Sequence, residues 1–131
     1  MIRSTYKGWE FEATLGLTPG YGHANESGVS VAEVAAAWTR ANDDLQYMEG
    51  APWIPVVMSE GTAVYAPTHG CPTGGERVIV IRASMNPHWY GDLTRWRRTA
   101  ETLLQGLAET FGQSTTQVSF WDSEFVYFQK G

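Results

Sequence analysis

The sequence contains a single cysteine, no long apolar run and few basic residues, and each shortage argues against a class of protein. Cys71 cannot form a disulfide within the chain, which fits a reducing compartment. No run of about 18 apolar residues that would cross a bilayer is present, and the first residues lack the pattern of an export leader. We therefore expect a cytoplasmic protein without a membrane partner.

The charge balance argues against nucleic acid as a partner. Nine Lys and Arg stand against fourteen Asp and Glu, and nucleic-acid binding draws most of its affinity from clustered basic side chains. Arg95, Arg97 and Arg98 form the one basic cluster, which we interpret as a solvated helix face. Six Trp, six Tyr and five Phe in an acidic chain suit a cationic small ligand instead, because aromatic faces attract cations.

Hydrophobic residues are plentiful, at 43% of 131 residues, which is enough for one sizeable core. We expect a single domain over residues 1–131. Residues 9–17 alternate apolar with polar or small side chains, which predicts a strand with one buried face. Its inward-facing residues should be Trp9, Phe11, Ala13, Leu15 and Leu17.

Three further regions have strand character. Residues 53–59 contain Pro55, which favours an edge strand or an irregular start to the strand. We expect a bend at Glu60 and Gly61 before residues 62–65 continue in extended form. Residues 77–83 form a nearly continuous apolar run, which is typical of a central strand. Residues 117–128 predict a final strand, or two short ones interrupted at Asp122 and Ser123.

Two amphipathic helices are predicted between these strands. Ser30 and Glu33 form a capping box, and the apolar stripe that follows extends to about Leu45. The second helix is capped by Asp92 and ends before Gly112. The two stripes consist of Val31, Val34, Ala35, Trp38, Ala41 and Leu45, and of Leu93, Trp96, Ala100, Leu103, Leu104, Leu107 and Phe111.

The order strand, helix, strand, strand, helix, strand matches the ferredoxin-like α+β plan. In that plan a mostly antiparallel sheet carries both helices on one face. We expect the other face to be open and apolar, with an aromatic-rich last strand. An uncovered apolar face is an association site, so we also expect a homo-oligomer.

Tyr65 and Glu76 bracket one loop between two neighbouring strands, so both should lie near the same end of the sheet. A carboxylate beside phenol and indole faces can hold an ammonium or sulfonium group in a partly dry pocket. The alternative is that Glu76 is a solvated loop charge and Tyr65 an ordinary strand residue.

The loop over residues 18–28 is glycine-rich, and glycines let the backbone approach a ligand closely. No Gly-Lys-Ser/Thr follows, so neither a phosphate loop nor a dinucleotide fingerprint is present. An ordinary surface loop remains the alternative to a ligand-binding wall. The candidate ligand-binding residues are Gly20, Tyr21, Gly22 and His23.

A metal site is a weaker interpretation. His69 and Cys71, with His23 or His88, offer ligand types that zinc prefers, but they lack the usual spacing of paired ligands. A nucleophilic Cys71 would need a positioned base that the sequence does not reveal. We expect neither a metal nor another cofactor.

The stretch from Tyr65 to Glu76 resembles the bacteriophage S-adenosylmethionine (SAM) lyases, once described as SAM hydrolases. The resemblance covers the order of elements from about Phe11 to Phe128. Locally it rests on Tyr65 followed by Cys-Pro-Thr-Gly-Gly-Glu-Arg at 71–77, leading into Val-Ile-Val at 78–80. The family similarly places a tyrosine at a strand end and a glutamate just before the next strand.

This resemblance implies a ferredoxin-like trimer that binds SAM between subunits and needs no cofactor. The substrate's own carboxylate would attack its γ-carbon, which releases methylthioadenosine and leaves homoserine lactone. Glu76 would hold the substrate's amino group, Tyr65 would pack near the sulfonium or the adenosine, and the loop from Gly20 to His23 would form a wall. Two alternatives remain: a PII-like oligomer that binds a nucleotide or SAM-like ligand without turnover, and a protein-interaction module.

Overall fold

The structure, a computed structural model, describes residues 1–17, 28–87, 91–113 and 116–131. Its elements follow the predicted order of strands and helices, with one short 3-10 helix added between two strands. They are β1 (Ile2–Gly16), α1 (Val31–Glu49), β2 (Val57–Ala63), the 3-10 helix η1 (Pro67–His69), β3 (Glu76–Ser84), α2 (Leu93–Thr110) and β4 (Gln117–Gln129).

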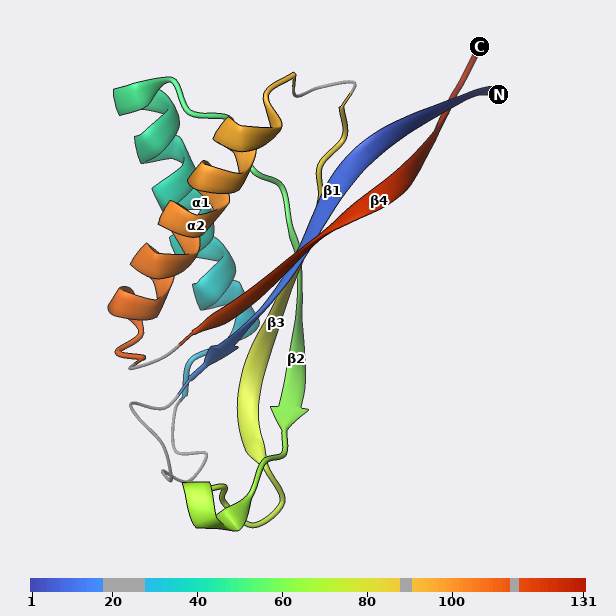
Figure 1. Ribbon diagram of the computed structural model, residues 1–131. Helices are drawn as coiled ribbons and strands as arrows, with labels where there is room; N and C mark the ends of the chain where they lie inside the picture. Colours follow the sequence, from blue (N-terminus) through green and yellow to red (C-terminus); the bar gives the residue numbers. More distant parts are fainter. Residues whose placement is uncertain (18–27, 88–90, 114–115) are drawn as a thin grey trace.

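The four strands form one antiparallel sheet in the order β2-β3-β1-β4. Both helices lie on one face of this sheet, and the other face is open (Figure 1). The ferredoxin-like α+β prediction is therefore confirmed. So are the edge position of β2 and the central position of β3.

The core lies between the sheet and the two helices. Phe11, Ala13 and Leu15 of β1 are at most 1% exposed, as the alternating pattern predicted. Phe11 packs against Trp96 of α2, with ring centroids 5.6 Å apart. Trp9 is only partly buried: it packs against the core, and the guanidinium of Arg97 lies 5.3 Å from its ring centroid.

Helix α1 begins as predicted and ends later than predicted. The Ser30 hydroxyl accepts a hydrogen bond from the backbone N–H of Glu33 at 3.2 Å, which is the expected cap. The helix continues past Leu45 to Glu49 and ends at Gly50, whose φ of 64° is left-handed. Its last turn is largely exposed, so no apolar stripe marked that extension in the sequence.

The interpretation of the arginine cluster as a solvated face was incomplete. Arg95 donates to the carbonyls of Glu49 and Gly50 at 3.0 and 2.8 Å, so a side chain of α2 caps the end of α1. Arg97 lies 4.4 Å from the ring centroid of Phe120, a cation–π distance. Arg98, by contrast, is exposed, as the interpretation expected.

Three strand boundaries differ from the prediction. Strand β2 begins at Val57, after Pro55, and Glu60 and Gly61 lie inside it without a bend, paired with β3. Strand β4 is continuous through Asp122 and Ser123, because β1 supplies a partner for each of its residues. Strand β1 begins at Ile2, seven residues earlier than predicted.

The early start of β1 creates a projecting two-stranded arm, which we define as residues 2–8 paired with residues 123–129. Strand β3 reaches only as far as Glu10 on β1, so the arm extends beyond the rest of the sheet (Figure 1). Ile2, Val126 and Phe128 of the arm are 57%, 36% and 58% exposed. A two-stranded ribbon has less support than the four-stranded part of the sheet, so the arm is the part of the sheet most open to a contact with another surface.

The open sheet face carries charged and polar side chains beside exposed apolar ones, Val57 at 71% and Trp121 at 44%, so the expected apolar surface is only partly present. Glu10 accepts hydrogen bonds from Ser84 and from the indole N–H of Trp121, at 2.9 and 3.0 Å. Beside them, Arg82 is paired with Glu12 at 2.6 Å. Ile2, Val126 and Phe128 add exposed apolar surface on the arm.

None of the helices in the described ranges is long and apolar enough to span a bilayer.

Candidate functional site

The β2–β3 hairpin brings Tyr65 and Glu76 together. Ala63, the last residue of β2, pairs with Glu76, the first residue of β3. Tyr65 lies two residues beyond that pair, so its side chain returns over the hairpin end. Its hydroxyl donates to Glu76 Oε2 at 3.2 Å.

Two glycines allow the loop to close at this point. Gly74 and Gly75 have φ values of 86° and 90°, which other residues rarely adopt. A Cβ on Gly75 would lie 2.5 Å from Thr62 Cγ2 and 2.9 Å from the backbone oxygen of Ala63. Only glycine fits there, and its conformation places Glu76 directly opposite β2.

The Glu76 carboxyl group is buried, with the residue only 8% exposed. Burying an ionised carboxylate is costly unless it is hydrogen-bonded, and the hydroxyl of Tyr65 supplies one such bond. The alternative of a solvated loop charge is therefore wrong for Glu76. Its neighbour Arg77 instead bonds the exposed Glu60 on β2, and this hydrogen bond lowers the pKa of the Glu60 carboxyl.

Cys71 supports the loop. Its sulfur accepts from the backbone N–H of Tyr65 at 3.5 Å and donates to the carbonyl of Pro72 at 3.4 Å. These contacts fix the backbone from which the Tyr65 side chain projects. Cys71 therefore has a structural role in the loop, which the sequence alone did not reveal.

Two further residues, which sequence reasoning missed, adjoin Glu76. Gly16 ends β1 beside the start of β3, and a Cβ at that position would lie 3.5 Å from Glu76 Oε1. The side chain of Gln113, just beyond α2, reaches the same point. No local motif marks either residue, because the contact depends on how the sheet meets the end of α2.

The predicted loop residues Gly20, Tyr21, Gly22 and His23 lie outside the described residues, and so does His88. His69 is at the end of η1 and is exposed. In the described part of the chain, no three His, Cys, Asp or Glu side chains gather as a metal site would require.

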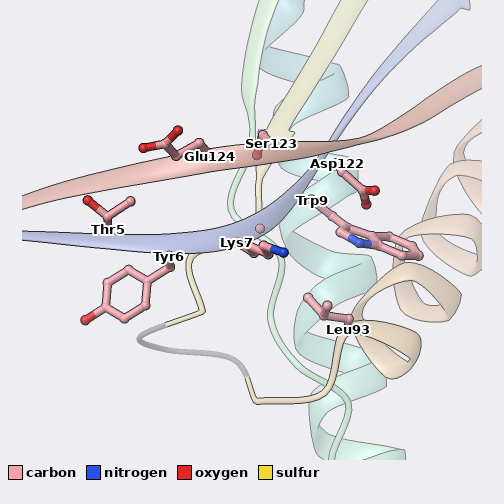
Figure 2. Close-up of a pocket in the computed structure, with 9 residues that line it drawn as sticks. Thr5, Tyr6, Lys7, Trp9, Leu93, Asp122, Ser123 and Glu124 are labelled. Carbon is pink, nitrogen blue, oxygen red and sulfur yellow. The ribbon is translucent and has the colours of Figure 1, made fainter.

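A cavity of about 640 Å³ lies at the opposite end of β1, between the arm and the start of α2. Figure 2 shows that its lining side chains come from both arm strands and from the first residue of α2, Leu93. Neither Tyr65 nor Glu76 lines it. Tyr6 is ten positions from Gly16 along β1, so the two sites are roughly 30 Å apart.

The fold and the hairpin pair define the class of protein: a ferredoxin-like α+β chain with a buried glutamate, bonded to a partly buried tyrosine, at one end of its sheet. The family model described as SAM lyase matches residues 7–129. The chain therefore belongs to the SAM lyase family.

One solved structure is similar to this chain, a phage SAM lyase in complex with S-methyl-5'-thioadenosine. The sequence identity is 12%, the TM-score is 0.57, and the match covers 93% of this chain and 90% of the other. At that identity the likeness supports the fold. No match is found among curated proteins.

Proposed function

We propose that this protein cleaves SAM into methylthioadenosine and homoserine lactone. The observation that supports this most directly is the buried Glu76 carboxyl group, bonded to the Tyr65 hydroxyl at 3.2 Å, in a chain of the SAM lyase family. A buried carboxylate beside an aromatic ring is suited to the cationic groups that SAM carries.

The reaction balances without a protein nucleophile or an added water. An oxygen of the substrate's carboxylate forms a bond to its own γ-carbon, and the bond between that carbon and the sulfur breaks. The electron pair of the broken bond goes to sulfur, so the positive sulfonium becomes the neutral thioether of methylthioadenosine. The amino acid part leaves as the five-membered lactone.

The enzyme's task in this scheme is to hold the substrate folded. Fixing the carboxylate near the γ-carbon turns a rare conformation into the bound one, and well-oriented intramolecular reactions gain large rate enhancements. Glu76 holds the substrate ammonium group, which lies one carbon away from the attacking carboxylate. Tyr65 holds the Glu76 carboxyl group in place and presents its ring to the cationic substrate.

Turnover of SAM tests this proposal. The purified protein is incubated with SAM, and methylthioadenosine is followed by chromatography against the spontaneous background. Binding of SAM without turnover would favour the PII-like alternative. If the protein neither binds nor cleaves SAM, a protein-interaction module is favoured. Either of these two results would overturn the lyase proposal.

Replacing Tyr65 with Phe should reduce the rate of SAM cleavage by about tenfold. The ring remains, but Glu76 loses a hydrogen bond, and bonds to charged groups are worth about 1.5–3 kcal/mol. Initial rates at saturating SAM measure the effect. Tyr47→Phe, at a tyrosine that is 92% exposed on α1, is the matched control and should keep the wild-type rate. Equal rates for the two variants would remove Tyr65 from the site.

We also propose that the chain assembles as a homotrimer and that the arm forms the contact between subunits. We place the protein in the cytoplasm, a reducing compartment that its single cysteine fits. The arm exposes the apolar side chains of Ile2, Val126 and Phe128. Another subunit of the same protein would cover them in a homo-oligomer. Phe128→Asp should convert the assembly to smaller species in light scattering. Tyr47→Asp, an equally drastic change on exposed α1, should leave it intact; a monomeric wild type would contradict the proposal.

A further inference from the structure

A gap at the end of β1 admits the side chain of Gln113 to the proposed site. A Cβ on Gly16 would lie 2.2 Å from Gln113 Oε1, closer than real Cβ atoms approach other heavy atoms, and 3.0 Å from Gln113 Cδ. The carboxamide of Gln113 thus occupies the space that a side chain at position 16 would fill. Glycine at position 16 therefore allows the Gln113 carboxamide to reach the proposed site.

The side-chain oxygens Gln113 Oε1 and Glu76 Oε1 lie close together beside Gly16. The Cβ position on Gly16 lies 2.2 Å from Gln113 Oε1 and 3.5 Å from Glu76 Oε1, so those two oxygens are at most 5.7 Å apart, the total of the two distances. An ammonium nitrogen that bonds two acceptors at about 2.9 Å spans oxygens about 4.7 Å apart. The two oxygens are thus within the range that one ammonium group can bridge.

We propose that the side-chain carbonyl of Gln113 is a second acceptor for the ammonium group of the substrate, beside the Glu76 carboxylate. This inference rests on the proposed function and extends it to a specific contact. An ammonium group has three N–H donors, and one acceptor leaves the others unsatisfied. Two fixed acceptors hold its direction as well as its position.

The orientation of Gln113 is set by the end of α2. Gly112 adopts a φ of 66°, and the backbone N–H of Gln113 then donates to the carbonyl of Ala108 at 2.8 Å. The side-chain Nε2 of Gln113 donates to the carbonyl of Phe111 at 3.2 Å. Because the amide nitrogen is held there, the amide oxygen is the atom that faces Gly16.

The electrostatics of the helix end favour the same ligand charge. Helix α2 ends at Thr110, and the carboxyl end of a helix carries a partial negative charge that attracts cations. Its last turn contains no basic residue. A bound ammonium group would therefore complement this helix end.

Two thioether ligands can distinguish a protein contact with the ammonium group from protein contacts with the adenosine. S-Adenosylhomocysteine carries the amino acid part with its ammonium group, and methylthioadenosine lacks it. Gln113→Ala should weaken binding of S-adenosylhomocysteine by about tenfold and leave binding of methylthioadenosine unchanged. Calorimetric titration of both ligands against wild type and variant measures the difference.

Gly16→Ala provides a second variant in which no polar group is removed. Its added methyl group must displace the Gln113 carboxamide, which is the flexible end of a side chain, so the same selective loss is expected. Gln105→Ala, at an exposed glutamine on α2, is the matched control and should bind both ligands as the wild type does. Thermal melting of each variant checks that the fold is kept.

If Gln113→Ala weakens the binding of both ligands equally, or of neither, the inference is overturned. The proposed function still stands in that case if the wild type cleaves SAM. A wild type that binds neither thioether and leaves SAM intact would overturn both. The two failures are therefore distinguishable in one set of titrations and one turnover assay.

Discussion

Glu76→Gln should lower the rate of SAM cleavage by about 100-fold or more while the protein stays folded. The substitution removes the negative charge that would hold the substrate ammonium and keeps nearly the same shape. Loss of one preorganised electrostatic group in an active site typically costs that much. Initial rates over a range of SAM concentrations measure the change.

The fold should tolerate this substitution because the main contact of the side chain survives. The hydroxyl of Tyr65, which donates to Glu76 Oε2 at 3.2 Å, can donate equally to the carbonyl oxygen of a glutamine. The melting temperature should therefore remain close to that of the wild type. Binding of methylthioadenosine, which has no ammonium group, should also persist.

Glu60→Gln is the matched control for Glu76→Gln. Glu60 lies in the same hairpin, on β2, and the hydrogen bond from Arg77 lowers the pKa of its carboxyl, so it is ionised at neutral pH. It is exposed, and its carboxylate accepts from Arg77, whereas the Tyr65 hydroxyl donates to Glu76. A wild-type rate for both variants would contradict the role of Glu76, whereas a loss in Glu76→Gln alone would support it.

Asn42→Ala should destabilise the protein by about 3 kcal/mol. Asn42 is 1% exposed; its Oδ1 accepts from the backbone N–H of Ile54 at 2.8 Å, and its Nδ2 donates to the carbonyl of Trp38 at 3.1 Å. Alanine would leave the buried N–H of Ile54 without this partner and would open a cavity, and each effect costs on the order of 1–3 kcal/mol. Urea unfolding at equilibrium measures the loss.

The control for Asn42→Ala is its neighbour. Asp43 also ties α1 to the segment before β2, since its carboxylate accepts from the indole N–H of Trp53 at 2.9 Å, but it is exposed. Asp43→Ala should cost less than about 1 kcal/mol, because water replaces the lost bond. If both variants lost the same stability, the buried hydrogen bonds of Asn42 would not be what holds this connection.

Contacts that are close in the sequence were predicted, and contacts that depend on distant elements were not. The Tyr65–Glu76 pair follows from a single hairpin, so the positions of two strand ends were enough to predict it. Gln113 and Gly16 meet only because the end of α2 lies over the end of β1. No pattern within either segment reports that juxtaposition.

The strand errors have the same physical cause. Asp122 and Ser123 have low strand propensity, yet they remain in β4 because Trp9 and Gly8 of β1 pair with them. Residues 2–8 were missed for the converse reason, since β4 pairs with them where no core face imposes an alternating pattern. Asn42 was missed because it is a polar residue on the buried side of α1.

Cleavage of SAM in ¹⁸O-labelled water tests the central claim most directly. If the substrate's carboxylate attacks its own γ-carbon, methylthioadenosine and unlabelled homoserine lactone appear first. Later opening of the lactone then places ¹⁸O in the carboxyl group and none in the hydroxyl group of homoserine. Homoserine that carries ¹⁸O in its hydroxyl group from the earliest time point, or no methylthioadenosine above the spontaneous background, would contradict the account.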